Sequence, residues 1–143
     1  MTLVVDASVA CKWFLDEVLA DEAFALAERE DDFLAPDLIL AEVANAVWKH
    51  RQRGEIGRAQ ASDIIARVPT AFRRLLPIGD LVGRAFAIAE TLEHPMYDCF
   101  YLAASEETNV VLVTADGRLA RRVVGTPWEG RVHSLSAGGI SGR

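Results

Sequence analysis

The chain has 143 residues, of which 51% are hydrophobic and 25% charged, and its formal net charge is -6. This length predicts one domain, and the apolar content is sufficient for a buried core, which excludes a disordered chain. No apolar run reaches the ~18 residues of a membrane span, and the first residues lack signal-peptide features, so a cytoplasmic protein is expected. Cys11 and Cys99 lie far apart in apolar stretches without zinc spacing, which predicts free, buried thiols.

Short apolar runs alternate with longer helical patterns along the chain. Extended segments are predicted, in chain order, at Leu3–Val5, Phe33–Ala35, Leu75–Ile78, 110–114 and 131–135. Helices are predicted between them near Val9–Leu15 and at Ala20–Glu30, Leu38–Arg53, Arg58–Val68, Leu81–Leu92, 97–108 and Gly117–Val124. This alternation predicts an α/β domain over residues 1–135, with a central, mainly parallel sheet of four to five strands covered on both faces. The Gly- and Ser-rich residues 136–143 are expected to form a flexible tail.

Two aspartates follow the apolar, β-branched runs of the predicted sheet. Asp6 comes directly after Leu3–Val5, and Asp116 follows the run 110–114 and precedes a predicted helix. Open α/β sheets bind ligands at the carboxyl ends of their strands. These two side chains are therefore expected beside one crevice.

Two further acids lie within predicted helices. Asp98 is in the first turn of helix 97–108, whose apolar residues face nearly all directions, so this helix should be enclosed and its acid should need a partner. Glu42 points away from the apolar stripe of helix Leu38–Arg53, on the same side as Asn45. Periodicity leaves open whether that side faces water or a site.

Each acid also has an ordinary structural interpretation. Aspartate is a preferred helix N-cap, which alone would account for Asp98 or Asp116, and Glu42 taken alone fits a solvated helix face. Asp6 fits this interpretation less well, because Ser8 is able to cap the following helix. The coincidence of all four acids favours a shared site, where converging carboxylates need a cation.

Four segments carry a resemblance to a known family. They are VVDASVACKWFLDE at Val4–Glu17, APDLILAEVANAVWK at Ala35–Lys49, YDCFYLAASEE at Tyr97–Glu107 and LVTADGRL at Leu112–Leu119. In this order they resemble the PIN-domain ribonucleases and, among these, the VapC toxins of bacterial toxin–antitoxin pairs. The resemblance spans almost the whole chain and implies a PIN-like three-layer α/β/α sandwich.

The resemblance also implies site residues and an activity. The family's metal-binding acids carry over to Asp6, Glu42, Asp98 and Asp116. Polar positions beside the family's site carry over to Ser8, Asn45 and Thr114. The implied activity is that of an Mg²⁺- or Mn²⁺-dependent endoribonuclease, a toxin that leaves a 5′-phosphate and a 3′-hydroxyl.

Two partners are implied in the same way. One is a second copy of the chain in a homodimer, and the other is a small antitoxin whose segment lies along a groove beside the acids, often with an arginine reaching them. Leu38, Trp48 and Ile65 are candidates for these contacts, and Trp48 fits a core position equally well. Some relatives have a further acid where this chain has Gly117 and Arg118, so a second metal is expected to bind weakly or only with substrate.

The residue types themselves suit metal-dependent hydrolysis. Carboxylates are hard oxygen ligands for Mg²⁺ or Mn²⁺, and His50, His94 and His133 have no zinc spacing. Such a metal orients a water, helps to deprotonate it and stabilises charge on the scissile phosphate. Two alternatives stay open. One is a catalytically silent PIN-fold binding module, and the other is a metal-dependent DNA nuclease, because the acids do not read the 2′-hydroxyl.

The net charge of -6 needs an explanation in a protein that acts on RNA, whose backbone repels acids. The four site acids supply -4 of it, which leaves -2 for everything else. Basic residues cluster at Lys49 with His50, Arg51 and Arg53, at Arg73 with Arg74, and at Arg118 with Arg121 and Arg122. Solvated helix faces commonly explain such clusters. Lys49 and Arg53 are the expected RNA contacts, because they continue the Glu42 side of their helix.

Overall fold

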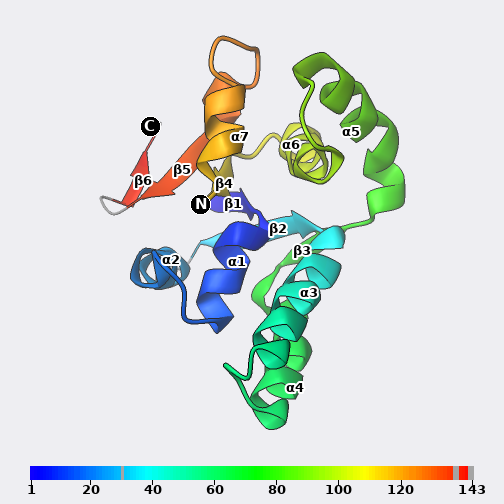
Figure 1. The fold of residues 1–143 in the computed structure, drawn as a ribbon. Helices are drawn as coiled ribbons and strands as arrows, with labels where there is room; N and C mark the ends of the chain where they lie inside the picture. The colour runs from blue at the N-terminus through cyan, green and yellow to red at the C-terminus, as the bar shows by residue number, and fades with distance from the viewer. Residues whose placement is uncertain (30, 137–138, 142–143) are drawn as a thin grey trace.

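A sheet of mainly parallel strands forms the centre of the computed structural model, which describes residues 1–29, 31–136 and 139–141 (Figure 1). Its strands are β1 (Thr2–Val5), β2 (Asp32–Pro36), β3 (Arg74–Leu76), β4 (Leu112–Thr114), β5 (Val132–Ser136) and β6 (Gly139–Ser141). They lie in the order β3-β2-β1-β4-β5-β6, and only the pair β5 and β6 is antiparallel. The continuous apolar run that predicted β1 places this strand in the middle of the sheet, covered on both faces.

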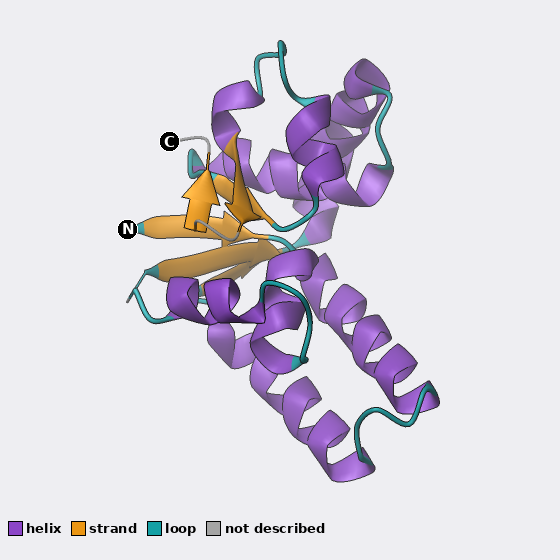
Figure 2. Cartoon of the chain, turned by 60° about the vertical axis from the view of Figure 1, so that its left-hand side comes forward, coloured by secondary structure: helices purple, strands orange, loops and turns teal. Residues whose placement is uncertain are grey.

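Helices cover both faces of this sheet (Figure 2). One face carries α1 (Ala7–Phe14), α2 (Ala20–Ala27), α3 (Leu38–Gln52) and α4 (Arg58–Arg67), and the other carries α5 (Ile78–Leu92), α6 (Met96–Thr108) and α7 (Gly117–Arg122). Single 3₁₀ turns follow α4 at Val68–Ala71 and precede β5 at Glu129–Arg131. The expected fold, a mainly parallel sheet between two helical layers, is confirmed.

The chain leaves the two central strands in opposite directions. From β1 it passes through α1 and α2 to β2 on one side, and from β4 it passes through α7 to β5 on the other. β1 and β4 are neighbours, with Val5 paired to Val113. A crevice opens at the carboxyl ends of strands whose connections diverge in this way. Asp6 and Asp116, which follow these two strands, therefore stand at this crevice.

Helix α6 is enclosed between α5 and the sheet (Figure 1). All residues from Cys99 to Ser105 are buried, as the apolar character on nearly all sides of this segment predicts. The Ser105 hydroxyl donates a hydrogen bond to the Val110 carbonyl, which ties the end of the helix to the segment leading into β4. This enclosure fixes Asp98, directly before the buried run, at the edge of the crevice.

Some element boundaries differ from the sequence prediction. Ile78 begins α5 instead of ending an extended segment, because Pro77 is extended and serves as the N-cap residue. The helix that starts at Ala20 ends at Ala27. Within the expected tail, Gly139–Ser141 forms β6 and hydrogen-bonds to the edge that β5 would otherwise expose. Residues 30, 137–138 and 142–143 lie outside the described part of the chain.

Both cysteines are free and buried, as predicted. Burial raises the pKa of Cys99 to about 11, so its thiol stays protonated at neutral pH. Across the ranges that the structure describes, no helix combines the length and the apolar character needed to cross a membrane.

We expect Leu102→Ala to lower the free energy of unfolding by about 2–5 kcal/mol, because Leu102 is fully buried in α6 and its truncation leaves a cavity. Urea denaturation followed by circular dichroism measures the change. Val18→Ala, at an exposed valine before α2, is the control, with an expected change below about 0.5 kcal/mol. Equal losses in the two variants would contradict the enclosure of α6.

Candidate active site

Asp6 lies deep in the crevice, where β1 ends and α1 begins, and it is 6% exposed. Its Oδ1 accepts hydrogen bonds from the Ser8 hydroxyl (2.5 Å) and the Val9 amide (3.2 Å). Its Oδ2 accepts one from the Thr114 hydroxyl (2.5 Å). Thr114 is the last residue of β4, so the Asp6 carboxylate joins the two strands that part at the crevice.

The surroundings of Asp6 disfavour its negative charge. Burial raises the pKa of Asp6 to about 6, and the nearby charge of Asp98 adds to the rise. The hydrogen bonds from Ser8, Thr114 and Val9 lower the pKa but do not offset the lost hydration. Among the described residues Asp6 makes no ion pair. A cation beside it would favour the ionised form.

Glu42 reaches the crevice from the first half of α3 and meets α6 there. The Tyr101 hydroxyl donates a hydrogen bond of 2.7 Å to its Oε1. Burial raises the pKa of Glu42, the Tyr101 hydrogen bond opposes this rise, and the charge of Asp98 adds to it. The side of α3 that carries Glu42 therefore faces other acids and a buried tyrosine as well as water.

Asp98 stands on the first turn of α6 with a side chain that is 31% exposed. The Nε2 atom of His94, in the loop before the helix, shares a hydrogen bond of 2.6 Å with its Oδ2. The N-cap position of α6 is Pro95, so helix capping does not account for this acid.

Asp116 lies at the start of α7, where its Oδ1 accepts a hydrogen bond of 2.9 Å from the Arg118 amide and caps the helix. The Arg118 guanidinium donates to both carboxylate oxygens, with a distance of 2.8 Å from Nη2 to Oδ2. These hydrogen bonds lower the pKa of Asp116. Asp116 thus has a cationic partner within its own helix, unlike Asp6 and Glu42.

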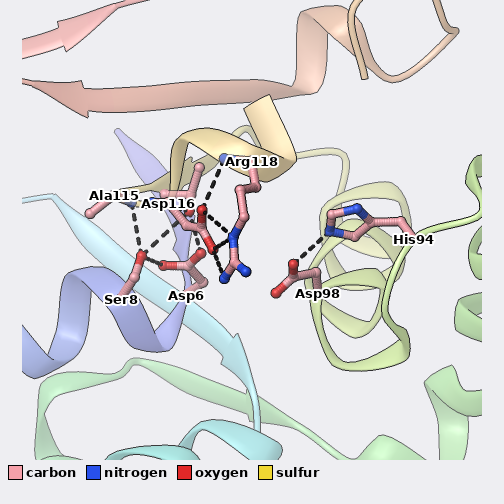
Figure 3. A network of polar contacts seen from close by, with 8 residues as sticks. Asp6, Ser8, His94, Asp98, Ala115, Asp116 and Arg118 are labelled. Carbon is pink, nitrogen blue, oxygen red and sulfur yellow. Dashed lines mark hydrogen bonds and ion pairs between the residues drawn. The ribbon is translucent and has the colours of Figure 1, made fainter. Parts of the chain in front are cut away.

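The four acids come from separate elements and face one crevice. The charge of Asp98 raises the pKa of both Asp6 and Glu42, which requires that the three carboxylates be near one another. Figure 3 shows Asp6 and Asp116 together at the strand ends, Asp98 across from them, and the Arg118 side chain reaching between. No three His, Cys, Asp or Glu side chains of the described residues form a ready-made metal cluster. The acids surround the crevice rather than meeting at one point.

This donor set fits a hard divalent cation. Its side-chain donors are carboxylate oxygens, which Mg²⁺ and Mn²⁺ prefer. The raised pKa values of Asp6 and Glu42 mark carboxylates that have no cationic partner among the described residues. A cation held by Asp6, Glu42 and Asp98 would relieve their mutual repulsion and keep them ionised.

Some predicted positions behave differently in the structure. Ser8 does not cap α1, because Asp6 is itself the N-cap and Ser8 donates to it. Asn45 is exposed one turn after Glu42, and its side chain makes no hydrogen bond with any residue that the structure describes. Lys49 and Arg53 are exposed at the carboxyl end of α3, which Figure 1 places beside α4 and away from the sheet.

The sequence analysis did not single out Tyr101, His94 or Arg118 as partners of the acids. Tyr101 had a usable signal, because it comes three residues after Asp98 and therefore shares a helix face with it. His94 had no such signal. It lies before Pro95 and outside α6, so its four-residue separation from Asp98 does not indicate a shared helix face.

The sequence profile of the PIN domain matches residues 3–124, so the chain belongs to the PIN-domain family. It is 31% identical to ribonuclease VapC3 of Pyrobaculum aerophilum over 124 aligned residues. This aligned region covers 85% of this chain and 95% of that relative. The crystal structure of PAE2754 from the same organism has a TM-score of 0.63 and 26% identity, over 88% of this chain and 82% of that one. A chain of a toxin–antitoxin complex from Klebsiella pneumoniae has a TM-score of 0.64 at 16% identity, over 91% of this chain and 94% of that one. The resemblance to the PIN-domain and VapC ribonucleases is confirmed.

We expect Asp6→Asn to raise the free energy of unfolding of the metal-free protein at pH 7 by roughly 2–3 kcal/mol. The pKa of Asp6 is raised from 3.8 to about 6 on folding, so the stability that its protonated form contributes is fully present below pH 3.8 and is lost as the pH rises through about 6. The neutral amide does not titrate, and the gain should nearly vanish at pH 4.

Chemical denaturation in EDTA at pH 4 and pH 7 measures this difference. Asp63→Asn, at an exposed carboxylate on α4, is the matched control and should change little at either pH. A gain for Asp6→Asn that is equal at both pH values would mean that the Asp6 carboxylate is not destabilised by burial.

Proposed function

We propose that this protein is a metal-dependent endoribonuclease and the toxin of a toxin–antitoxin pair, with Asp6, Glu42, Asp98 and Asp116 as the metal-binding acids. The observation that carries this proposal is the convergence of four acids from separate elements at the switch crevice of a PIN domain. The 31% sequence identity to a VapC ribonuclease, over 95% of that relative, supports the activity. Mg²⁺ or Mn²⁺ is the proposed cofactor, and the RNA substrate implies a cytoplasmic place of action.

The protein side chains have distinct roles in this proposal. When bound, the metal activates a water and stabilises negative charge on the scissile phosphate. Three hydrogen bonds fix the orientation of Asp6 toward the crevice. Glu42 accepts the proton of the attacking water, because its pKa is raised and the Tyr101 hydrogen bond engages only Oε1. Asp116 stays ionised because Arg118 lowers its pKa. The products are a 5′-phosphate and a 3′-hydroxyl.

We expect Asp98→Asn to reduce RNA cleavage on the order of 100-fold or more with the fold intact, because a neutral amide replaces an anionic ligand of similar shape. RNA from cells that briefly express the protein, mapped for new 5′-phosphate ends, identifies the cleaved site, and an oligonucleotide of that sequence gives the rates. A DNA oligonucleotide of the same sequence tests the alternative nuclease activity.

Asp63→Asn again supplies the control, since it removes one carboxylate far along α4 without touching the four acids. Circular dichroism of all variants checks the fold. Full activity in Asp98→Asn would refute the assignment of the site, and a parent protein without activity on any RNA or DNA would leave only a binding module.

We propose an antitoxin protein as the partner that inhibits this activity. Membership of the VapC group supports this partner, and a neighbour of the same fold is itself a toxin–antitoxin complex. Trp48 on α3 and Ile65 on α4 are exposed apolar side chains and suit such a contact, whereas Leu38 is partly buried against the core. The interpretation of Trp48 as a core residue is wrong, because 58% of it is exposed.

We propose a homodimer on the basis of a second apolar surface. Ile78, Val82 and Phe86 are exposed on α5 at four-residue spacing, so they form one stripe along the helix. A single face that buries such a stripe against its own copy is the usual geometry of a twofold dimer.

We expect Phe86→Glu to convert this dimer to a monomer, because a charge replaces the most exposed side chain of the α5 stripe. Light scattering on a size-exclusion column measures the mass. Val18→Glu is the matched control at an isolated exposed valine and should leave the mass unchanged. A parent protein that is monomeric at high micromolar concentration would refute the dimer itself.

A further inference from the structure

An open cavity of about 520 Å³ lies directly beside the acids, between the amino end of α6 and helix α7. Its lining residues are His94, Pro95, Arg118, Arg121, Arg122 and Val124. Two of these residues also contact the site acids. The Arg118 guanidinium is 2.8 Å from Asp116, and the His94 ring is 2.6 Å from Asp98. The cavity therefore lies next to the acids, with these two side chains between them.

The cavity has a strongly positive lining. It presents three arginines and no carboxylate. Arg118 shares its charge with Asp116, whereas Arg121 and Arg122 are exposed and make no ion pair with any part of the chain that the structure describes. Two uncompensated guanidinium groups select an anion with several acceptor oxygens, and phosphate matches their planar fork of donors.

Gly117 brings one of these arginines close to the acids. A side-chain carbon at Gly117 would lie 2.7 Å from Nη1 of Arg121, so the guanidinium folds back over the start of α7, beside Asp116. The backbone of Gly117 does not have a positive φ, so what this residue contributes is space for the flexible end of the Arg121 side chain, which a methyl group here would displace.

We infer that this cavity binds a phosphate of the RNA strand next to the scissile one, with Arg121 and Arg122 as the residues that hold it. The inference rests on the proposed ribonuclease function, which puts the scissile phosphate at the four acids. A strand that leaves the acids past Arg118 and His94 enters the cavity at once. The strand thus passes over α7, on the opposite side of the crevice from α3.

The test measures binding of a fluorescently labelled single-stranded RNA by anisotropy at several salt concentrations. All proteins carry Asp98→Asn so that the RNA stays intact. We expect Arg121→Ala with Arg122→Ala to weaken binding roughly 5- to 20-fold. The slope of log affinity against log salt is negative, and it should become shallower by about 0.7 for each phosphate that the variant no longer neutralises.

A matched double variant exists on the same chain. Arg73 and Arg74 are also adjacent arginines, but they border a cavity with Thr2 and Val110 at the amino ends of the strands, the far end of the sheet from the acids. Arg73→Ala with Arg74→Ala removes the same charge and should leave the salt slope unchanged. Lys49→Ala with Arg53→Ala tests the alternative route along α3. An equal loss in the Arg73 and Arg74 variant, or no loss in the Arg121 and Arg122 variant, would overturn the inference.

A second variant moves a guanidinium without removing it. Gly117→Ala should displace Arg121 and weaken RNA binding about two- to threefold, and it should have no further effect once Arg121 and Arg122 are alanine. A Gly117→Ala effect that persists without these arginines would show that the cavity does not act through them. If the double arginine variant binds RNA normally and loses only the antitoxin, the cavity holds an acidic protein segment instead, and the inference is again wrong.

Cleavage kinetics distinguish a failure of this inference from a failure of the proposed function. With Mg²⁺ or Mn²⁺ and an intact Asp98, loss of Arg121 and Arg122 should raise KM with little change in kcat, because a phosphate away from the reacting bond is bound equally in ground and transition states. A parent enzyme that cleaves RNA while the double variant keeps its KM refutes the cavity alone. A parent that cleaves no RNA refutes the proposed function.

Discussion

The buried carboxylate of Asp6 is the constraint on which the rest of the structure depends. It ends the central strand, caps α1 through the Val9 amide and accepts a hydrogen bond from Thr114 of the neighbouring strand. The same group therefore fixes the start of a helix and the join between two diverging strands. Because burial outweighs these hydrogen bonds, the pKa of Asp6 is raised and the fold carries a local cost that a bound cation would remove. The ionised form of Asp6 lowers the stability of the fold, and the same ionised form is the one that would bind a cation.

The other acids divide by depth in the crevice. Glu42, like Asp6, has a raised pKa caused mainly by burial, whereas Asp116 at the rim has a lowered pKa caused mainly by Arg118. Negative charge is thus uncompensated in the interior and paired at the edge. A cation is attracted to the deep carboxylates, and a phosphate is attracted to the arginines at the rim. In the proposed function this polarity would orient a phosphodiester across the site, with its reacting phosphorus toward the acids.

Sequence reasoning was strongest where one residue's position follows from its neighbours along the chain. Strand-end residues such as Asp6 are predictable because a buried apolar run ends immediately before them. Relations across the fold are not predictable in this way. The contact between Tyr101 and Glu42 joins residues 59 positions apart on two helices, and His94 meets Asp98 across Pro95, the N-cap residue of α6, where helical spacing does not apply. β6 was missed because Ile140 stands alone between Gly139 and Ser141, which gives no strand pattern, and pairing with β5 decides the conformation of this segment.

A net charge of -6 does not prevent an interaction with RNA, because charges act mainly over the ~8–10 Å within which salt does not screen them. Within that range of the crevice the acids are the intended partners of a cation, and the basic residues beside them are Arg118, Arg121 and Arg122. The remaining acidic residues are spread over helices, loops and β2, and those beyond this range act on RNA only through screened, long-range repulsion. Such repulsion slows the encounter and makes weak, unspecific contacts unfavourable. In the inferred binding mode, RNA binding would then depend on the few sites where a phosphate meets an unpaired guanidinium, and the acidic surface would become a source of selectivity.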